Sequence, residues 1–217
     1  MVVPGVNVEE LGAILDYGIQ ASPVVRGIHM QPVSYFGRRP VLPQNHDRIT
    51  LPEILAALET QSRGKVRARD FHPPGCENAL CSFHGRFFTT EGGGLKPLVT
   101  LPITSTCSPP EAADVGARRA VSAVVRQWGA GPELGGRDPN ASAPDASGPM
   151  DLDSFLEVTR NRSFSISAMA FQDAWNLDLE RLRDCFIHVV AEDGRLIPFC
   201  AYNLTDSGNQ PLYRGRQ

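Results

Sequence analysis

The fold class is decided by residues 1–33, MVVPGVNVEELGAILDYGIQASPVVRGIHMQPV. Residues 1–3 form a short apolar run, and Pro4-Gly5 then turns the chain. Apolar residues recur at helical spacing over 11–19, and a second apolar run occupies 24–33. A strand, a helix and a strand within about 30 residues form a βαβ unit. The opening therefore predicts an α/β fold with a parallel sheet.

The first helix is expected to begin at a capping box. Asn7 is followed three residues later by Glu10, so each side chain can bond the other residue's backbone N–H. One face of the helix is then expected to be buried. The residues on that face are Leu11, Ile14, Leu15 and Ile19.

The middle of the chain predicts a second capped helix and a hairpin. Thr50 and Glu53 form another capping box, before a helix with Leu51, Ile54, Leu55 and Leu58 on one side. Two β-rich stretches follow, 83–90 and 95–103, and the glycine-rich segment between them predicts a tight turn.

The C-terminal part predicts an α+β arrangement. A short helix is expected at 152–159, a strand at 164–171, where polar and apolar residues alternate, and a further helix at 177–183. A second hairpin is expected from 185–190 and 195–200, joined by a polar turn.

Composition divides the chain into five stretches. Alanine, glycine and proline dominate residues 108–150, which predicts a flexible insertion or linker. The predicted units are 1–64, the cysteine loop and hairpin of 65–107, the linker of 108–150, a cysteine-containing α+β segment of 151–205, and a tail of 206–217.

Length and charge exclude several classes of protein. At 217 residues the chain is shorter than a complete eight-stranded α/β barrel, which takes about 250. The net charge of -3 argues against a nucleic-acid-binding surface. No apolar run approaches the ~20 residues of a membrane span, and there is no secretory signal pattern, so a cytoplasmic location is expected.

Four of the five cysteines suggest a metal site. Cys76 and Cys81 share a proline-rich loop, whereas Cys185 and Cys200 stand at the open ends of the second predicted hairpin. If that hairpin has a four-residue loop, Cys185 lies opposite Cys200. Four thiolates suit an iron–sulfur cluster or zinc, between which the residues do not decide. The alternative is a set of separate buried thiols.

Other candidate groups are weaker. Cys107 is the fifth cysteine, and His72 and His84 flank the cysteine loop, where they could be ligands or orient it. Asp173 and Asp178 fit helix capping better than catalysis. The sequence contains no nucleophile elbow, zinc-protease motif or phosphate-binding loop.

Several stretches resemble the late strands of a radical S-adenosylmethionine barrel. They are VVPGVN (2–7) with EELG (9–12), VRGIHMQPVS (25–34), DFHPPGC (70–76), and FIH (186–188) with DGRLIPFCAYN (193–203). The segment at 70–76 and the C-terminal motifs are similar to the branch that includes archaeal tetraether lipid synthases. The resemblance covers most of 1–107 and 151–204.

The resemblance implies a partial parallel α/β barrel, whose late βα units are residues 1–64, followed by a hairpin-rich extension. It favours an auxiliary [4Fe–4S] cluster on Cys76, Cys81, Cys185 and Cys200. Gln31 and Ser34 would face the cofactor and substrate cavity.

The family's C-x3-C-x2-C loop, which holds the cluster that cleaves S-adenosylmethionine, is absent from these residues. The expectation is therefore a C-terminal fragment that is inactive alone. The missing N-terminal half-barrel would be supplied in trans or upstream, and S-adenosylmethionine would bind only to the complete enzyme. Two alternatives stay open: a non-enzymatic module holding structural zinc or carrying electrons, and a chain that has lost its function.

Overall fold

A mixed four-stranded sheet forms the centre of the structure, a computed structural model that describes residues 1–37, 41–73, 78–90, 92–98, 115, 118, 121–122 and 161–214. The strands stand in the order β1-β4-β2-β3, with β1 parallel to β4 and the other pairs antiparallel. Their bounds are Gly27–Met30 (β1), Ser82–Thr89 (β2), Leu95–Pro97 (β3) and Ser163–Met169 (β4).

The first predicted strand is reduced to one bridge. Val2 pairs with Pro32 in the parallel sense, with Val2 N–H donating to Gln31 O at 2.7 Å and Val33 N–H donating to Val2 O at 3.0 Å. The strand cannot grow further because Pro4 and Pro32 have no N–H. The parallel direction is confirmed, but the main parallel partner of β1 is β4.

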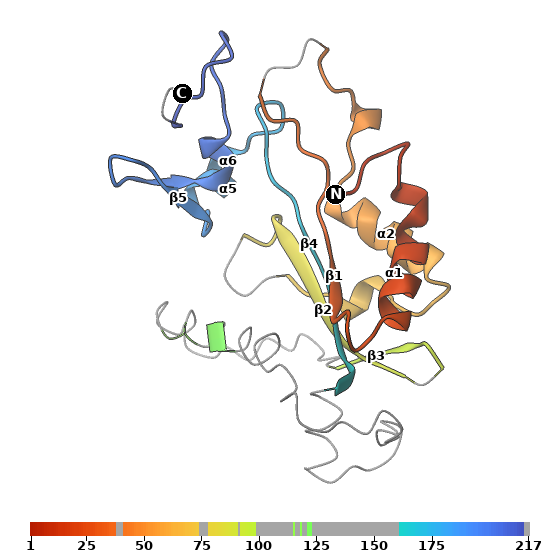
Figure 1. The fold of residues 1–217 in the computed structure, drawn as a ribbon. Coiled ribbons are helices and arrows are strands. Elements are labelled where there is room, and N and C mark those ends of the chain that lie inside the picture. Colours follow the sequence, from red (N-terminus) through yellow and green to blue (C-terminus); the bar gives the residue numbers. More distant parts are fainter. Residues whose placement is uncertain are drawn as a thin grey trace.

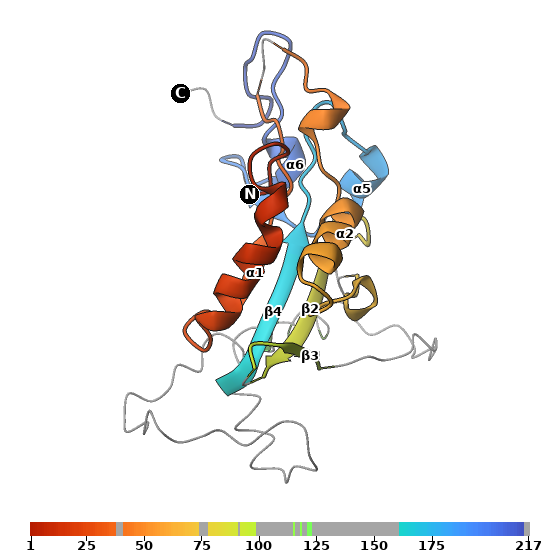
Figure 2. The ribbon, with the colours of Figure 1, turned by 90° about the vertical axis from the view of Figure 1, so that its right-hand side faces the viewer.

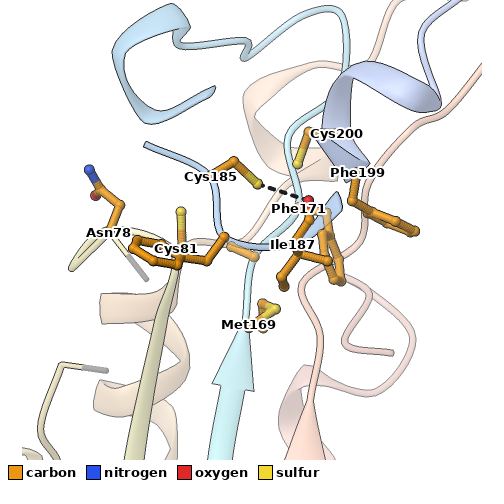
Figure 3. A pocket seen from close by; sticks show the side chains of 10 residues that line it. Asn78, Cys81, Met169, Phe171, Cys185, Ile187, Phe199 and Cys200 are labelled. Atoms are coloured by element: carbon orange, nitrogen blue, oxygen red, sulfur yellow. Dashed lines mark hydrogen bonds between the residues drawn. The ribbon is translucent and has the colours of Figure 1, made fainter. Parts of the chain in front are cut away.

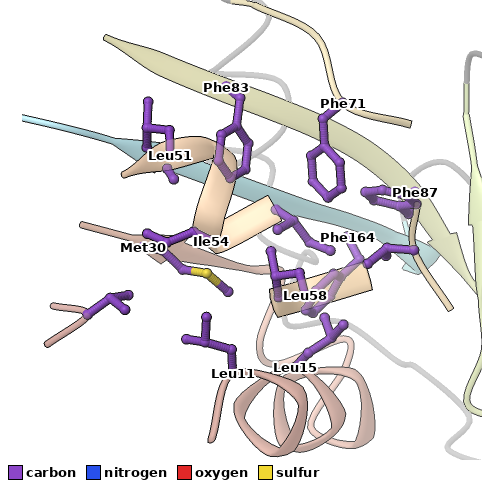
Figure 4. Close-up of a cluster of buried hydrophobic side chains, with 14 of the residues drawn as sticks. Leu11, Leu15, Met30, Leu51, Ile54, Leu58, Phe71, Phe83, Phe87 and Phe164 are labelled. Atoms are coloured by element: carbon purple, nitrogen blue, oxygen red, sulfur yellow. The ribbon is translucent and has the colours of Figure 1, made fainter. Parts of the chain in front are cut away.

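Two helices, α1 (Leu11–Gln20) and α2 (Leu51–Gln61), cover one face of the sheet (Figures 1 and 2). Phe164 and Ile166 of β4 point toward them and are buried, while the serines between them point to the opposite face. This helix-covered core, which Figure 4 shows in close-up, contains Leu11, Leu15, Ile19, Met30, Leu51, Ile54, Leu58, Val66, Phe71, Phe83, Phe87, Phe164, Ile166 and Ala168.

The predicted capping box of the first helix is wrong. A 3-10 turn, η1 (Val8–Glu10), precedes α1, and Asn7 Oδ1 accepts from Val3 N–H instead of capping. The N–H of Gly12 is satisfied from another helix, by Gln61 Oε1 at 2.9 Å. This contact needs Gly12, because a Cβ there would lie 2.8 Å from Gln61 Cβ. Ile14 is 40% exposed, so it does not belong to the buried face.

The second cap and the first hairpin are confirmed. Thr50 and Glu53 form the reciprocal capping box of α2, and Thr89 pairs with Leu95 across the predicted turn. Two further 3-10 turns, η2 (Asn45–Asp47) and η3 (Ala68–Asp70), lie in the connections.

The C-terminal segment lies beyond the carboxyl ends of β1 and β4 (Figure 1). It consists of α5 (Leu179–Arg183), β5 (His188–Val190), β6 (Leu196–Pro198) and α6 (Phe199–Tyr202). The hairpin of β5 and β6 is confirmed, but Val190 pairs with Leu196, so the loop has one residue more than the four that the sequence suggested. Cys185 is therefore not opposite Cys200, which lies in α6.

The mixed sheet with helices is an α/β fold, as predicted. The predicted helix at 152–159, the strand residues 99–103 and nearly all of the 108–150 linker lie outside the described residues. Among the residues that are described, no helix is both long and apolar enough to cross a membrane.

Candidate metal centre

The candidate site lies at the carboxyl ends of the two parallel strands, β1 and β4. Residues that follow β1 and β4 leave the sheet at the same end, because the two strands run in the same direction. The beginning of β2 lies there too, since β2 is antiparallel to β4 and Ser82 pairs with Met169. In α/β folds, ligands bind at the carboxyl ends of parallel strands.

Three cysteines meet in a pocket at this end. Cys81 comes from the turn before β2, Cys185 from the segment before β5, and Cys200 from α6. Figure 3 shows the three side chains around one space. We call this the cysteine pocket; the rest of its wall is largely apolar and includes Met169, Phe171, Ile187 and Phe199.

Short-range geometry holds Cys81 in place. The N–H of Cys81 donates to Asn78 O at 2.8 Å, which closes a turn. Its carbonyl accepts from Ala170 N–H at 2.8 Å, which continues the pairing of β2 with β4 by one step. These backbone hydrogen bonds therefore fix Cys81 beside the carboxyl end of β4.

The three sulfurs have polar contacts. Gln172 N–H donates to Cys200 Sγ at 3.3 Å, and Arg181 Nη2 donates to Cys81 Sγ at 3.2 Å. Cys185 Sγ donates to Ile187 O at 3.2 Å, the dashed line in Figure 3. Two of the three sulfurs therefore accept hydrogen bonds, and a metal-bound thiolate can accept the same bonds.

The pKa of the Cys200 thiol shows how closely the groups are associated. Burial raises this pKa, and the Gln172 N–H bond opposes that effect. Cys185 and Cys81 also raise the pKa, whereas the positive charge of Arg181 lowers it. A bound metal ion would replace the proton and remove the cost of a buried, unpaired thiolate.

The residues present fit a thiolate-bound group by their chemistry. Among the described residues, however, no group of three or more His, Cys, Asp or Glu side chains is placed so that it could hold a metal ion. Cys76, the fourth predicted ligand, and Cys107 both lie outside the described residues. The pocket has room for about 30 Å³, the space of about two water molecules, so a cluster needs the thiols to move apart.

Gln31 and Ser34, the residues predicted to face a cavity, follow β1 at the same end of the sheet. Ser34 Oγ donates to Phe171 O at 2.8 Å, so Ser34 touches a residue that lines the cysteine pocket. The Gln31 carbonyl accepts the bridge from Val2. Both residues are half-buried, and their role in binding stays a prediction.

The sheet face opposite the helices carries a row of polar side chains. His29 pairs with Ser167, Ser167 with His84, and His84 with His72, so four neighbouring segments contribute. His29 Nδ1 lies 2.9 Å from Ser167 Oγ, and the rings of His72 and His84 lie 6.4 Å apart. Burial lowers the pKa of His29, which favours the neutral ring. We call these four residues the polar row.

The two acidic candidates have structural contacts. Asp178 caps α5, accepting from Glu180 N–H and Arg181 N–H. Asp173 is fully buried and accepts from Arg48 Nη2 at 2.9 and 3.1 Å, and from the N–H groups of Tyr35 and Trp175. The capping prediction is confirmed for Asp178, and Asp173 joins the segment after β4 to the segment after β1.

Arg181, His29 and Ser167 were not singled out from the sequence, whereas His72 and His84 were considered only as ligands or as residues that orient the cysteine loop. The serines that alternate with apolar residues in β4 were a usable signal for a polar face, because successive side chains of a strand point to opposite sides. Arg181 had no such signal, because its partner Cys81 lies 100 residues away.

Comparison with known proteins gives one informative relative. The chain is 28% identical, over an alignment of 247 residues, to 7,8-dihydro-6-hydroxymethylpterin dimethyltransferase of Methanocaldococcus jannaschii. The alignment covers 93% of this chain and 46% of that protein, so the chain spans about half the length of this curated relative. No family profile matches the chain. The similarity supports the resemblance to the radical S-adenosylmethionine superfamily.

Proposed function

We propose that this chain is the C-terminal part of a radical S-adenosylmethionine enzyme and that it binds an auxiliary [4Fe–4S] cluster. The ligands are Cys76, Cys81, Cys185 and Cys200. The observation that carries the proposal is the cysteine pocket, in which three of these four thiols, from separate segments, line one space at the carboxyl ends of parallel strands. The similarity to the archaeal dimethyltransferase supports the choice of superfamily.

A cluster held there supplies electron transfer or a rigid cross-link. Four thiolates leave no iron position for a substrate, so the site serves relay or structure. The chain's own residues exclude water with the apolar wall, which includes Met169 and Phe171, and donate hydrogen bonds to sulfur from Gln172 and Arg181. Hydrogen bonds to sulfur and low solvent exposure are the means by which proteins adjust such a centre.

The sheet face opposite the helices forms part of the substrate cavity in this proposal. In α/β barrels the helices cover the outside, so the uncovered strand face is the inner one. Here that face carries the polar row, and Gln31 and Ser34 continue the polar surface toward the cysteine pocket. Imidazole and hydroxyl groups form hydrogen bonds with polar partners, which suits a polar ligand.

The chain depends on a partner for radical chemistry. The C-x3-C-x2-C loop that these 217 residues lack is supplied by an N-terminal half-barrel, in trans or upstream. S-adenosylmethionine binds only when that half is present. The isolated chain therefore does not cleave S-adenosylmethionine.

Anaerobic reconstitution with iron and sulfide tests the proposal. The 217-residue chain should turn brown and retain about four irons and four sulfides. Replacing Cys81, Cys185 and Cys200 together by serine should abolish that retention, whereas Cys107→Ser, the matched control, should not. Retention of iron by the triple variant would contradict the assignment.

A structural zinc ion is the competing occupant, and one observation favours it. The pocket's room of about 30 Å³ is closer to the size of a single ion than to that of a cluster. Metal analysis of the anaerobically purified chain decides between the two. One equivalent of zinc, with no colour after reconstitution, would replace the cluster proposal with the zinc module.

A further inference from the structure

We infer that Arg181 is a positioning residue for the metal centre. Its guanidinium donates to the cysteine sulfurs and sulfides of a negatively charged cluster, and its positive charge stabilises the reduced form of that cluster. This inference rests on the proposed function. Its basis is a guanidinium that pairs with sulfur instead of a carboxylate, and that keeps one buried donor unused.

The contact with Cys81 is specific in its placement. Arg181 Nη2 donates to Cys81 Sγ at 3.2 Å, joining residues 100 positions apart in the sequence. The guanidinium of Arg181 thus contacts one of the three thiols of the cysteine pocket directly.

Arg181 is held from behind by a chain of hydrogen bonds. Its backbone N–H and that of Glu180 donate to the Asp178 carboxylate, which caps α5. Asp178 N–H donates to Gln172 Oε1 at 2.5 Å, and Gln172 N–H donates to Cys200 Sγ. Gln172 therefore connects the helix that carries Arg181 to the sulfur of Cys200.

The unused donor is the second observation. Arg181 Nε is buried and has no hydrogen-bond partner in the described part of the chain. No described carboxylate lies within ion-pair distance of this side chain. A buried charged donor without an acceptor is costly, so this arrangement points to an anionic acceptor that the described residues do not supply.

A thiolate-ligated cluster would give Arg181 both a negative charge nearby and sulfur acceptors for its hydrogen bonds. One-electron reduction makes the cluster more negative, so a neighbouring positive charge stabilises the reduced state more than the oxidised state. Arg181 should therefore raise the reduction potential of the cluster.

Potentiometric titration of the reconstituted 217-residue chain tests this role, with the cluster followed by its visible absorption and electron paramagnetic resonance. In Arg181→Gln, which loses the charge, the ratio of reduced to oxidised cluster at a fixed potential should fall about tenfold, or about 59 mV for a one-electron couple. Arg181→Lys should restore most of that loss. Arg183→Gln is the matched control, because Arg183 is an exposed arginine of the same helix, and its titration should equal that of the unmodified chain.

The outcomes separate the two proposals. If the unmodified chain retains no iron, the proposed function fails. If it retains iron and Arg181→Gln titrates at an unchanged potential, the inference about Arg181 fails alone. Loss of the cluster in both Arg181 variants also overturns it, since that pattern shows a structural requirement. Loss of the cluster in Arg181→Gln together with its retention in Arg181→Lys supports the inference, because lysine keeps the positive charge and glutamine does not.

Discussion

Two regions of the chain, the helix-covered core and the cysteine pocket, differ in what fills them. The core contains large apolar side chains with no exposure, such as Leu15, Ile54 and Phe87. Around the pocket, Leu179 and Phe186 are more than 60% exposed, and the close contacts are the ring pair of Phe171 and Phe199 and a few hydrogen bonds to sulfur. Apolar burial therefore contributes most of the stability of the core, whereas hydrogen bonds contribute a larger share around the pocket.

One ion pair joins the two regions. Asp173 follows β4 on the way to the cysteine pocket, and Arg48 comes from the segment that leads into α2. The carboxylate is fully buried, and the Arg48 side chain is 19% exposed. Mutations in each region, and in this ion pair, can therefore show how independent the two regions are.

The largest expected effect is in the core. Phe164→Ala should lower the free energy of unfolding by about 3–5 kcal/mol, because it opens a cavity between β4 and the helices. Chemical denaturation measures the loss. Phe186→Ala, at the pocket, removes a side chain that is 63% exposed and should change it by less than about 0.5 kcal/mol. A comparable loss in both variants would show that the pocket belongs to the core.

The second-largest effect is expected at the ion pair of Arg48 and Asp173, which joins the two regions. Asp173→Ala leaves the Arg48 charge without its partner and deprives Tyr35 N–H and Trp175 N–H of their acceptor. The free energy of unfolding should fall by about 3 kcal/mol. Asp193→Ala, which breaks an exposed pair with Arg195, should have no measurable effect. An Asp173→Ala variant as stable as the unmodified chain would show that this ion pair does not hold the two regions together.

A smaller effect should be confined to the pocket side. Asp178→Ala removes the cap of α5 and should cost about 1 kcal/mol locally. Amide hydrogen exchange in α5 should then accelerate about fivefold, while exchange in α2 stays unchanged. Acceleration in both helices would show that the two regions open together.

The smallest effect depends on pH and belongs to the core side. Hydrogen bonds from Thr50 lower the pKa of Glu53 in the folded chain. A lowered pKa contributes stability above the ordinary pKa of a glutamate, and this contribution is lost as the pH falls through the folded value. Glu53 is largely exposed, so Glu53→Gln should cost only about 0.5 kcal/mol at neutral pH. Denaturation curves of the two proteins should converge near pH 3; a constant gap would exclude the carboxylate as the cause.

Local patterns were sufficient for several elements. Thr50 and Glu53 interact three residues apart, and the alternation in 163–169 specifies a strand with one apolar face. The hairpin of β2 and β3 follows from its glycine-rich turn. In each case the deciding contacts lie within a few residues. The capping prediction at Asn7 was wrong because Asn7 Oδ1 accepts from Val3 N–H, and the N–H of Gly12 donates to Gln61, 49 residues away.

The sequence by itself determined α1, α2 and α5, the two hairpins, the alternating faces of β4 and the supply of thiols, because these depend on neighbouring residues; α6 was missed, since 195–200 was predicted to be a strand throughout. Only the tertiary structure decided that β4 lies between β1 and β2, and that Cys81, Cys185 and Cys200 share a pocket. It also decided that Arg181 meets Cys81 and that Arg48 meets Asp173. These contacts span 100 residues or more, so they follow from how the layers pack and not from any local pattern.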